Sequence, residues 1–187
     1  MKRKTADFQP LLCNLFPVNW VHIIVHYCER RHVKKKLVWI VAALTLIVIG
    51  MQAIRPERLN PPTVDSLAIA HHLRIEPDIA RLLRNACFDC HSNETRWPWY
   101  SDIAPASWLL ARDVSEGRKH LNFSLWGKYA GVRQLTALSG IAEEVSEEKM
   151  PYPPYLLLHP EARLDSVARQ RIVAWAERER DRIAGDN

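Results

Sequence analysis

Two cysteines and a histidine form the most distinctive chemical group in the sequence. Cys87 and Cys90 stand three residues apart, and His91 follows directly, in the stretch ACFDCHSNE. This C-x-x-C-H spacing is the attachment signature of haem c. Two thiols at this spacing on a helix can add to the vinyl groups along one porphyrin edge, and the histidine then binds iron from one side. The composition of the chain predicts this pattern by chance only roughly 0.004 times, which favours a chemical reason for it.

Two other uses of paired thiols are alternatives. A structural zinc site needs four ligands, and the chain beyond residue 54 has no further cysteine. The histidines that remain there are scattered: His71, His72, His120 and His159. A thiol–disulfide oxidoreductase is expected to carry its Cys pair at the start of a helix after a strand. Here the pair stands at the end of a helical pattern, so the spacing favours haem.

A second axial iron ligand is expected from a proline-rich loop. Met150 is the only methionine after residue 54 and stands in KMPYPP, where the prolines stiffen a non-helical segment. A thioether held there would complete His/Met coordination by His91 and Met150, which raises the reduction potential and suits electron transfer. The alternatives are that Met150 only packs beneath the loop, or that His120 or His159 is the ligand.

Other residues are candidates for contact with the haem itself. Haem is a broad apolar plate, so some of the aromatic side chains that follow the motif are expected to cover it, with Trp97 and Trp99 the nearest. Arg96 is a candidate partner for a haem propionate, because its planar guanidinium matches a carboxylate. A surface arginine explains Arg96 nearly as well.

An uncharged segment near the start predicts a membrane anchor. Residues 37–54, LVWIVAALTLIVIGMQAI, would span about 27 Å as a helix, close to the thickness of a bilayer core. A basic cluster, RRHVKKK, stands directly before the segment. Because basic residues flank membrane helices on the cytoplasmic side, the N-terminus is expected in the cytoplasm and the chain after the segment outside. We therefore expect a single-pass protein of the bacterial inner membrane with a periplasmic domain. An uncleaved anchor is favoured over a removed signal peptide, and a buried core helix is the alternative.

The positive charge of the chain lies in its first 36 residues. They hold eight of the 26 Lys/Arg and two of the 21 Asp/Glu, which leaves a net charge of −1 on the remainder. This distribution argues against nucleic-acid binding by the globular part. The stretch from Val33 onward is by itself a basic region followed by an apolar core, VKKKLVWIVAALTLIVIG. One hypothesis is therefore that translation starts at Val33 and that residues 1–32 are a gene-model extension.

The part of the chain after residue 54, which is expected in the periplasm, is predicted to fold as a small all-α domain of the cytochrome c type. A proline-rich linker over residues 55–70 precedes a haem-binding domain over 71–183. Apolar residues at helical spacing predict four helices, and Gly117 is expected to end the second of them. Their expected ranges are 76–91, 105–116, 133–148 and 165–185. Residues 149–160 cannot be helical because of their four prolines.

Longer stretches of the sequence resemble a known family. The stretches are CFDCHSNETRWPWYSDIAPASWLLARDVSEGRKHLNFSLW, EEVSEEKMPYPPYLLLHPEARL and RIVAWA, within roughly residues 70–180. They resemble the bacterial haem-binding domain family that has a single C-x-x-C-H. The resemblance implies a membrane-anchored or periplasmic single-haem domain, with Cys87, Cys90 and His91 in the haem site and Met150 supported by its position. The long N-terminal arm departs from the usual short one.

These observations predict a membrane-anchored c-type cytochrome with one covalent haem c that transfers single electrons in the periplasm. Its expected partners are the cytochrome c maturation machinery and periplasmic or membrane redox proteins. No enzymatic activity is expected, although peroxide reduction with His120 or His159 as a distal base is a weaker alternative. The main alternative is a haem-based sensor or ligand-binding module whose sixth iron position is open or weakly held.

Overall fold

The computed structural model describes residues 18–185 and divides the chain into two units, the second of which starts at Ile54. Every regular element in the described residues is a helix, which confirms the prediction of an all-α protein. The hypothesis on residues 1–32 falls largely outside the description, since residues 1–17 are not described and side chains are described only from Val33.

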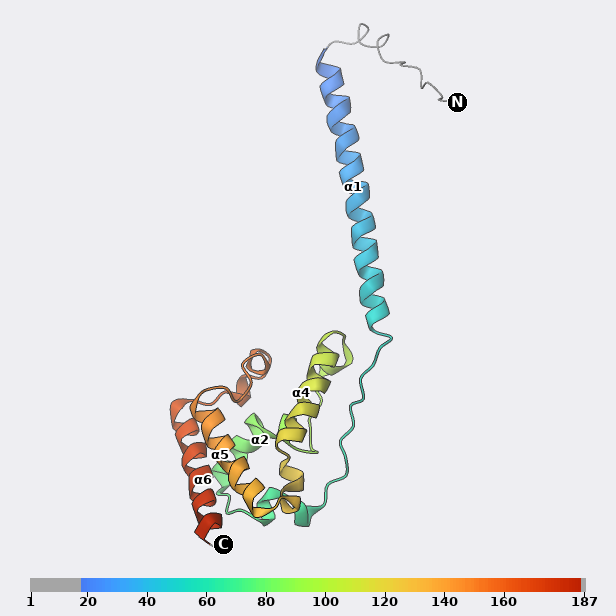
Figure 1. Ribbon diagram of the computed structural model, residues 1–187. Helices are drawn as coiled ribbons and strands as arrows, with labels where there is room; N and C mark the ends of the chain where they lie inside the picture. Colours follow the sequence, from blue (N-terminus) through green and yellow to red (C-terminus); the bar gives the residue numbers. More distant parts are fainter. Residues whose placement is uncertain (1–17, 186–187) are drawn as a thin grey trace, which may run out of the picture. The chain divides into compact units, whose positions relative to one another are not determined.

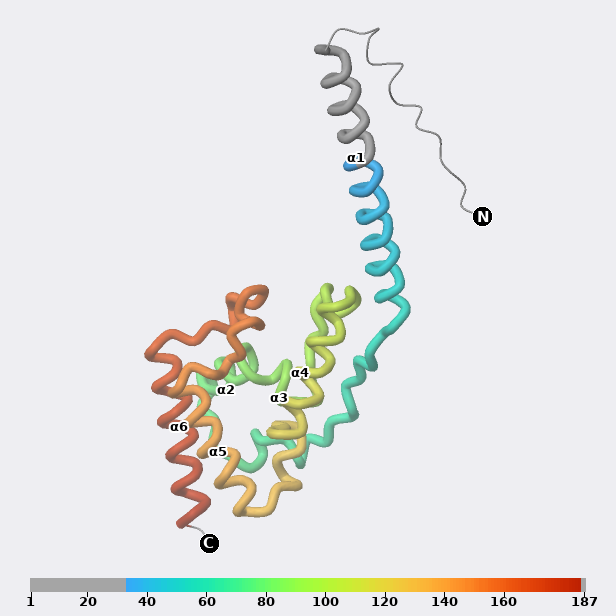
Figure 2. Tube along the Cα trace, turned by 45° about the horizontal axis from the view of Figure 1, so that its top comes forward, coloured from blue at the N-terminus to red at the C-terminus, as the bar shows by residue number. Residues whose placement is uncertain are grey.

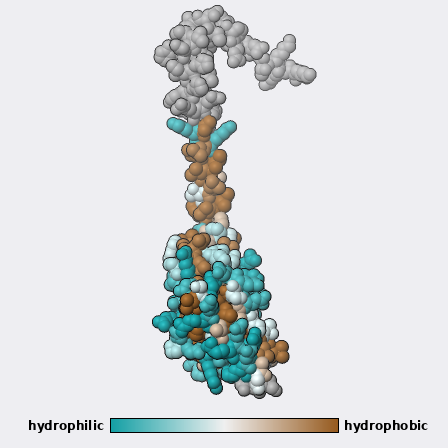
Figure 3. Space-filling model, turned by 90° about the vertical axis from the view of Figure 1, so that its left-hand side faces the viewer, coloured by the Kyte–Doolittle hydropathy of each residue, from teal (hydrophilic) through white to brown (hydrophobic). Residues whose placement is uncertain are grey.

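The first unit contains one long helix, α1, over Val18–Met51. Its apolar side chains between Leu37 and Ile49 are exposed, and Figure 3 shows this part of the chain as mostly brown. Among the described residues, no helix is long and apolar enough to cross a membrane. This finding does not support the predicted spanning segment over residues 37–54.

Five α-helices build the second unit. They are α2 (Pro77–Ala86), α3 (Phe88–His91), α4 (Ala106–His120), α5 (Gly131–Ser146) and α6 (Ser166–Gly185). Figures 1 and 2 show α5 and α6 side by side, with α4 on the opposite side of the domain. Helix α2 contacts α6, and α3 contacts α4. The α2–α3 segment, which carries the cysteine motif, therefore connects the two sides.

The hydrophobic core forms where α5 and α6 face α2. Leu138 of α5 and Ile172 and Trp175 of α6 are fully buried, as their helical spacing predicts. Burial of each such side chain stabilises the fold by about 1.5–3 kcal/mol relative to exposure. Asp165 accepts a hydrogen bond from the backbone N–H of Ala168 at 2.7 Å, which caps the start of α6.

Two predictions about the helices near the motif are wrong. The expected helix over residues 76–91 is broken at Cys87, whose backbone (φ −130°, ψ −37°) leaves helical geometry between α2 and α3. Gly117 does not end its helix, because α4 continues to His120. It lies inside the helix with a negative φ, so its role is not conformational.

Short 3₁₀ turns connect the helices. They are η1 (Asp65–Leu67), η2 (Ile69–His71), η3 (Trp99–Asp102), η4 (Phe123–Lys128), η5 (Tyr155–Leu157) and η6 (Pro160–Ala162). Since η5 lies within residues 149–160, the expectation that this segment contains no helical turn is wrong. Prolines are tolerated there because 3₁₀ turns this short need few backbone N–H donors.

The predicted linker is attached to the domain. Residues 55–62 contain no helix, as their prolines predict. Arg118 of α4 donates hydrogen bonds to the Leu59 carbonyl at 2.8 Å and to the Asn60 side chain at 2.7 Å. Arg58 donates to the Ser101 hydroxyl at 2.8 Å. These contacts order the segment on the surface of the domain, next to the loop that follows the motif.

Candidate functional site

The two thiols and the histidine of the motif share one helical turn. The Cys87 carbonyl accepts hydrogen bonds from the backbone N–H groups of Cys90 at 3.2 Å and His91 at 2.9 Å. Both cysteines are free thiols and partly buried. Their withdrawal from water raises the pKa of each thiol to about 12, and their mutual repulsion as thiolates adds to this at Cys87. The turn thus presents two protonated sulfurs and an imidazole together.

His91 is oriented by helix α4. Its Nδ1–H donates to the carbonyl oxygens of Gly117 at 3.0 Å and Leu121 at 3.2 Å, two groups at the C-terminal end of that helix. Because a carbonyl can only accept, this contact places the proton on Nδ1 and the lone pair on Nε2. No described residue hydrogen bonds to Nε2. Burial lowers the pKa of His91, which favours the neutral, metal-binding form.

The contact between α3 and α4 requires a glycine. A Cβ atom on Gly117 would lie 2.6 Å from the carbonyl oxygen of Cys90 and 3.2 Å from the Cys90 Cβ. Real Cβ atoms do not approach an oxygen this closely. The absence of a side chain at Gly117 therefore lets α4 bring its carbonyl to His91.

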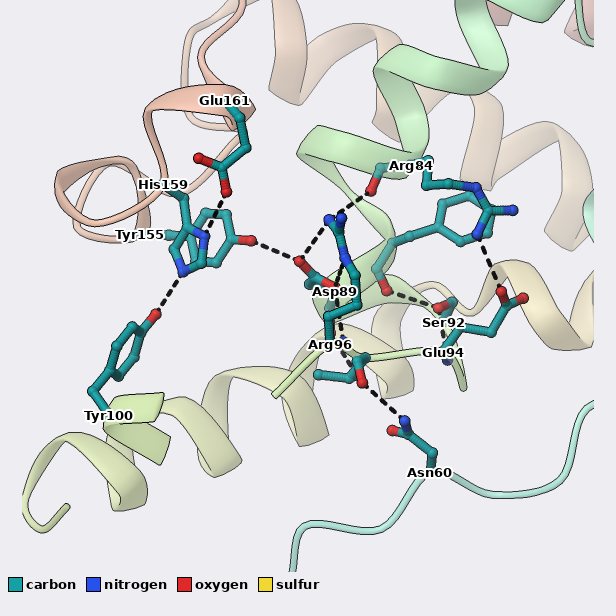
Figure 4. Close-up of polar contacts among 12 residues, drawn as sticks. Asn60, Arg84, Asp89, Ser92, Glu94, Arg96, Tyr100, Tyr155, His159 and Glu161 are labelled. Atoms are coloured by element: carbon teal, nitrogen blue, oxygen red, sulfur yellow. Dashed lines mark hydrogen bonds and ion pairs between the residues drawn. The ribbon is translucent and has the colours of Figure 1, made fainter. Parts of the chain in front are cut away.

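A buried carboxylate lies inside the motif. Asp89, between the two cysteines, accepts hydrogen bonds from the Arg96 backbone N–H at 3.0 Å and from its guanidinium at 3.1 and 3.2 Å. The Tyr155 hydroxyl donates at 2.8 Å to Oδ2 of the carboxylate, the oxygen that also accepts from Arg96 Nη2. Figure 4 shows Asp89 between these two partners. Arg96 is therefore engaged with the motif itself, and its contact with a haem propionate stays a prediction.

Residues 149–162, here called the distal loop, carry a second group of polar side chains. The His159 ring stacks on Tyr155 with centroids 4.0 Å apart. Its Nδ1 donates to Glu161 at 2.9 Å, and its Nε2 accepts from the Tyr100 hydroxyl at 2.8 Å (Figure 4). The distal loop is thus bonded to η3 through Tyr100 and to α3 through Tyr155.

Met150 stands at the start of the distal loop with a fixed backbone. Its N–H donates to the Glu144 carbonyl at 3.0 Å. Its side chain is partly buried and packs against the hydrophobic core, as do Cys87 and Phe88. The structure therefore places Met150 and the motif against the same core, while its bond to iron stays a prediction. His120, an alternative ligand, is exposed at the end of α4.

The two tryptophans predicted to contact the cofactor differ in environment. Trp97 is partly buried, and its indole N–H is buried without a hydrogen-bond partner in the described part of the chain. Such a donor is rarely left unpaired. Trp99 is 74% exposed. A bound haem, with an apolar face and two carboxylates, fits both an unpaired indole donor and an exposed aromatic surface.

The donor set bears on the zinc alternative. Among the side chains described from Val33 onward, no three His, Cys, Asp or Glu residues are grouped so that they could hold a metal ion. A structural zinc site needs four such ligands, so the described residues do not support the zinc alternative.

Asp89, Gly117 and Tyr155 are site residues that the sequence reasoning did not identify. Asp89 occupies a variable position of the C-x-x-C-H pattern, so its type carries no motif signal. Gly117 was interpreted as a helix end, and Tyr155 lies 65 residues beyond Cys90. Only contacts across the fold show the roles of these three residues.

Two free thiols and an oriented histidine on one turn are the groups that a covalently bound haem needs. Comparison with protein families agrees: residues 46–178 match the haem-binding domain family. The match covers more than half of the chain, and the protein belongs to this family. No curated protein and no solved structure is significantly similar to the chain.

Proposed function

We propose that the protein is a c-type cytochrome that holds one haem covalently and transfers single electrons. The observation that carries this proposal is the geometry of His91. Its Nδ1 is held by two backbone carbonyls while Nε2 has no partner among the described residues, on the same turn as two free thiols. A histidine ligand anchored through its other nitrogen is typical of protein metal sites.

Each residue has a defined part in this proposal. The Cys87 and Cys90 thiols each add across one vinyl group: a carbon–sulfur bond forms, the thiol hydrogen moves to the neighbouring vinyl carbon, and no oxidant is consumed. His91 Nε2 binds iron, and Met150 supplies the second axial ligand. The bound haem supplies one-electron oxidation and reduction. The protein itself anchors the group, orients the imidazole and shields the porphyrin.

A denaturing gel tests covalent attachment. The full chain is expressed with a cytochrome c maturation system, and the gel is stained for haem peroxidase activity. Haem that is bonded to the chain survives denaturation and stains at the mass of the protein. We expect this stain in the unaltered chain and in the control Cys28→Ala. The double variant Cys87→Ala/Cys90→Ala loses it, and no stain in a well-expressed unaltered chain contradicts the proposal.

The Met150→Ala variant separates electron transfer from the alternative of a haem sensor. If Met150 is the axial ligand, its removal lowers the reduction potential and opens iron to carbon monoxide, because a thioether ligand favours the ferrous state. A sensor with an open sixth position binds carbon monoxide before the change and is little altered by it. Difference spectra of the reduced protein with carbon monoxide, together with a redox titration, measure both effects.

We also propose that the uncharged run 37–54 anchors the protein in the bacterial inner membrane, with the haem domain in the periplasm. The support comes from the sequence, namely the absence of charge in the run and the basic residues before it. Fractionation of cells tests this proposal: the chain is expected in the membrane pellet after a carbonate wash, and its recovery in the supernatant contradicts an anchor.

A further inference from the structure

The hydrogen bonds around Asp89 connect the two sides of the proposed haem site. Asp89 lies between the cysteines of the motif, two residues before His91. Tyr155 lies in the distal loop, five residues after Met150. The 2.8 Å bond from the Tyr155 hydroxyl to the Asp89 carboxylate is therefore a direct contact between the turn that attaches haem and the loop that carries the proposed second ligand.

The carboxylate is held rigidly for this contact. Asp89 is 8% exposed, and three N–H groups of Arg96 bind it, one of them from the backbone. Its position is thus determined by the motif and the loop directly after it, independently of the distal loop. A charged acceptor fixed in this way makes a stronger hydrogen bond than a neutral one.

Tyr155 is correspondingly half-buried and oriented. Its ring is stacked on His159 at an interplanar angle of 7°, and its hydroxyl points to Asp89 (Figure 4). Burial, together with the bond to Asp89, raises the pKa of Tyr155, so the hydroxyl stays protonated and remains a donor at any physiological pH.

The two ends of the distal loop are attached to the domain, since Pro151 and Ala162 are buried and the Met150 carbonyl accepts a hydrogen bond from Arg169 at 3.4 Å. The middle of the loop has few such attachments. Tyr152, Leu157 and Leu158 are exposed by 48%, 77% and 60%, and they add little packing. The other side-chain bond from the loop across the site runs from His159 to Tyr100 of η3, away from the motif. The Tyr155–Asp89 bond is thus the contact by which the motif itself positions the loop.

We propose that Asp89 and Tyr155 form a latch that positions the distal loop, and with it the second axial ligand, against the haem-attachment turn. This inference rests on the proposed function. Asp89 and Tyr155 are positioning residues, since neither binds the iron. Covalent attachment depends on Cys87, Cys90 and His91 and is independent of the latch.

Tyr155→Phe tests the latch, because it removes only the hydroxyl and keeps the ring stacked on His159. In the haem-loaded full chain, we expect hydrogen exchange at the amides of residues 155, 157 and 158 to accelerate by roughly tenfold or more. These amides bond to carbonyls within the loop. The exchange of core amides in α5 stays as in the unaltered chain. Tyr152→Phe, which removes an exposed hydroxyl of the same loop, is the matched control.

Two variants of the carboxylate provide an independent test if Tyr155→Phe does not fold. Asp89→Ala removes the acceptor and is expected to accelerate exchange in the loop. Asp89→Asn keeps an oxygen that can accept from Tyr155, and it is expected to restore slow exchange. In the variants with a loosened loop, carbon monoxide binds reduced iron more readily and the reduction potential falls, effects that a purely structural role in the loop does not produce.

The outcomes separate the latch from the proposed function. The latch is overturned if loop exchange, carbon monoxide binding and reduction potential are all unchanged in both Tyr155→Phe and Asp89→Ala. If the haem stain is intact in these variants, the cytochrome assignment stays in place. Loss of the haem stain in the unaltered chain overturns the cytochrome assignment itself, and with it the role given to the latch.

Discussion

Gly117→Ala tests whether the close contact between α3 and α4 orients His91. The added Cβ would lie 2.6 Å from the Cys90 carbonyl oxygen, whereas ordinary contacts between carbon and oxygen begin near about 3.4 Å. Helix α4 must therefore move away from α3 by about 0.8 Å. The bond of 3.0 Å between His91 Nδ1 and the Gly117 carbonyl then lengthens beyond hydrogen-bond distance.

The energetic cost of Gly117→Ala follows from two opposing terms. Overpacking at a rigid backbone contact costs about 1–3 kcal/mol. Alanine in place of glycine inside a helix stabilises the folded state by up to about 1 kcal/mol, because alanine has the higher helix propensity. We expect the free energy of unfolding to fall by about 1–2 kcal/mol in urea titration. In the haem-loaded protein the potential rises, since an imidazole without its hydrogen bond is a weaker donor to ferric iron.

Gly140→Ala is the matched control, because a Cβ at Gly140 meets no atom within 4 Å. It lies inside α5 and is expected to be neutral or stabilising by up to about 1 kcal/mol. If Gly117→Ala behaves like Gly140→Ala in both stability and potential, the contact does not orient His91, and the reasoning is refuted.

Two further predictions concern the thiols and the core. In the haem-free chain, the raised thiol pKa of about 12 at Cys87 and Cys90 predicts that alkylation by iodoacetamide, followed by mass spectrometry, still increases with pH up to about pH 12. Since the unfolded thiols lose their protons near pH 9, the free energy of unfolding is expected to fall as pH rises from about 9 to 12. Alkylation that levels off near pH 9 contradicts the raised thiol pKa. Leu138→Ala is expected to cost about 2–5 kcal/mol in urea unfolding, because its side chain is fully buried in the core. Val132→Ala, on the exposed side of the same helix, is expected to stay within about 0.5 kcal/mol, and an equal effect of both changes argues against the core assignment.

The sequence was sufficient for the helical class and for the core faces of α5 and α6. Leu138, Ile172 and Trp175 recur at helical spacing, and burial of such a stripe is the main source of stability for a helix in a protein. The periodicity therefore predicts which side faces inward. It does not predict where a helix breaks: the pattern of residues 76–91 continues through Cys87, where the backbone turns from α2 into α3.

The C-x-x-C-H motif was also readable from the sequence, because its three residues lie within a single turn and their spacing alone brings them together. The partners of the motif could not be read in this way. The Gly117 carbonyl reaches His91 only after α4 has packed on α3, and Gly117 carries no side chain whose chemistry could signal a role. The Tyr155–Asp89 bond likewise joins residues 66 positions apart.

The sequence by itself thus determined what depends on local spacing: the helical class, the inward faces of the helices and the Cys87, Cys90 and His91 turn. The tertiary structure decided which nitrogen of His91 is free and which side chains hold the distal loop. The physical reason is that these properties arise from hydrogen bonds and close contacts between segments distant in the chain. Such contacts depend on how the helices pack, and local residue preferences do not encode that packing.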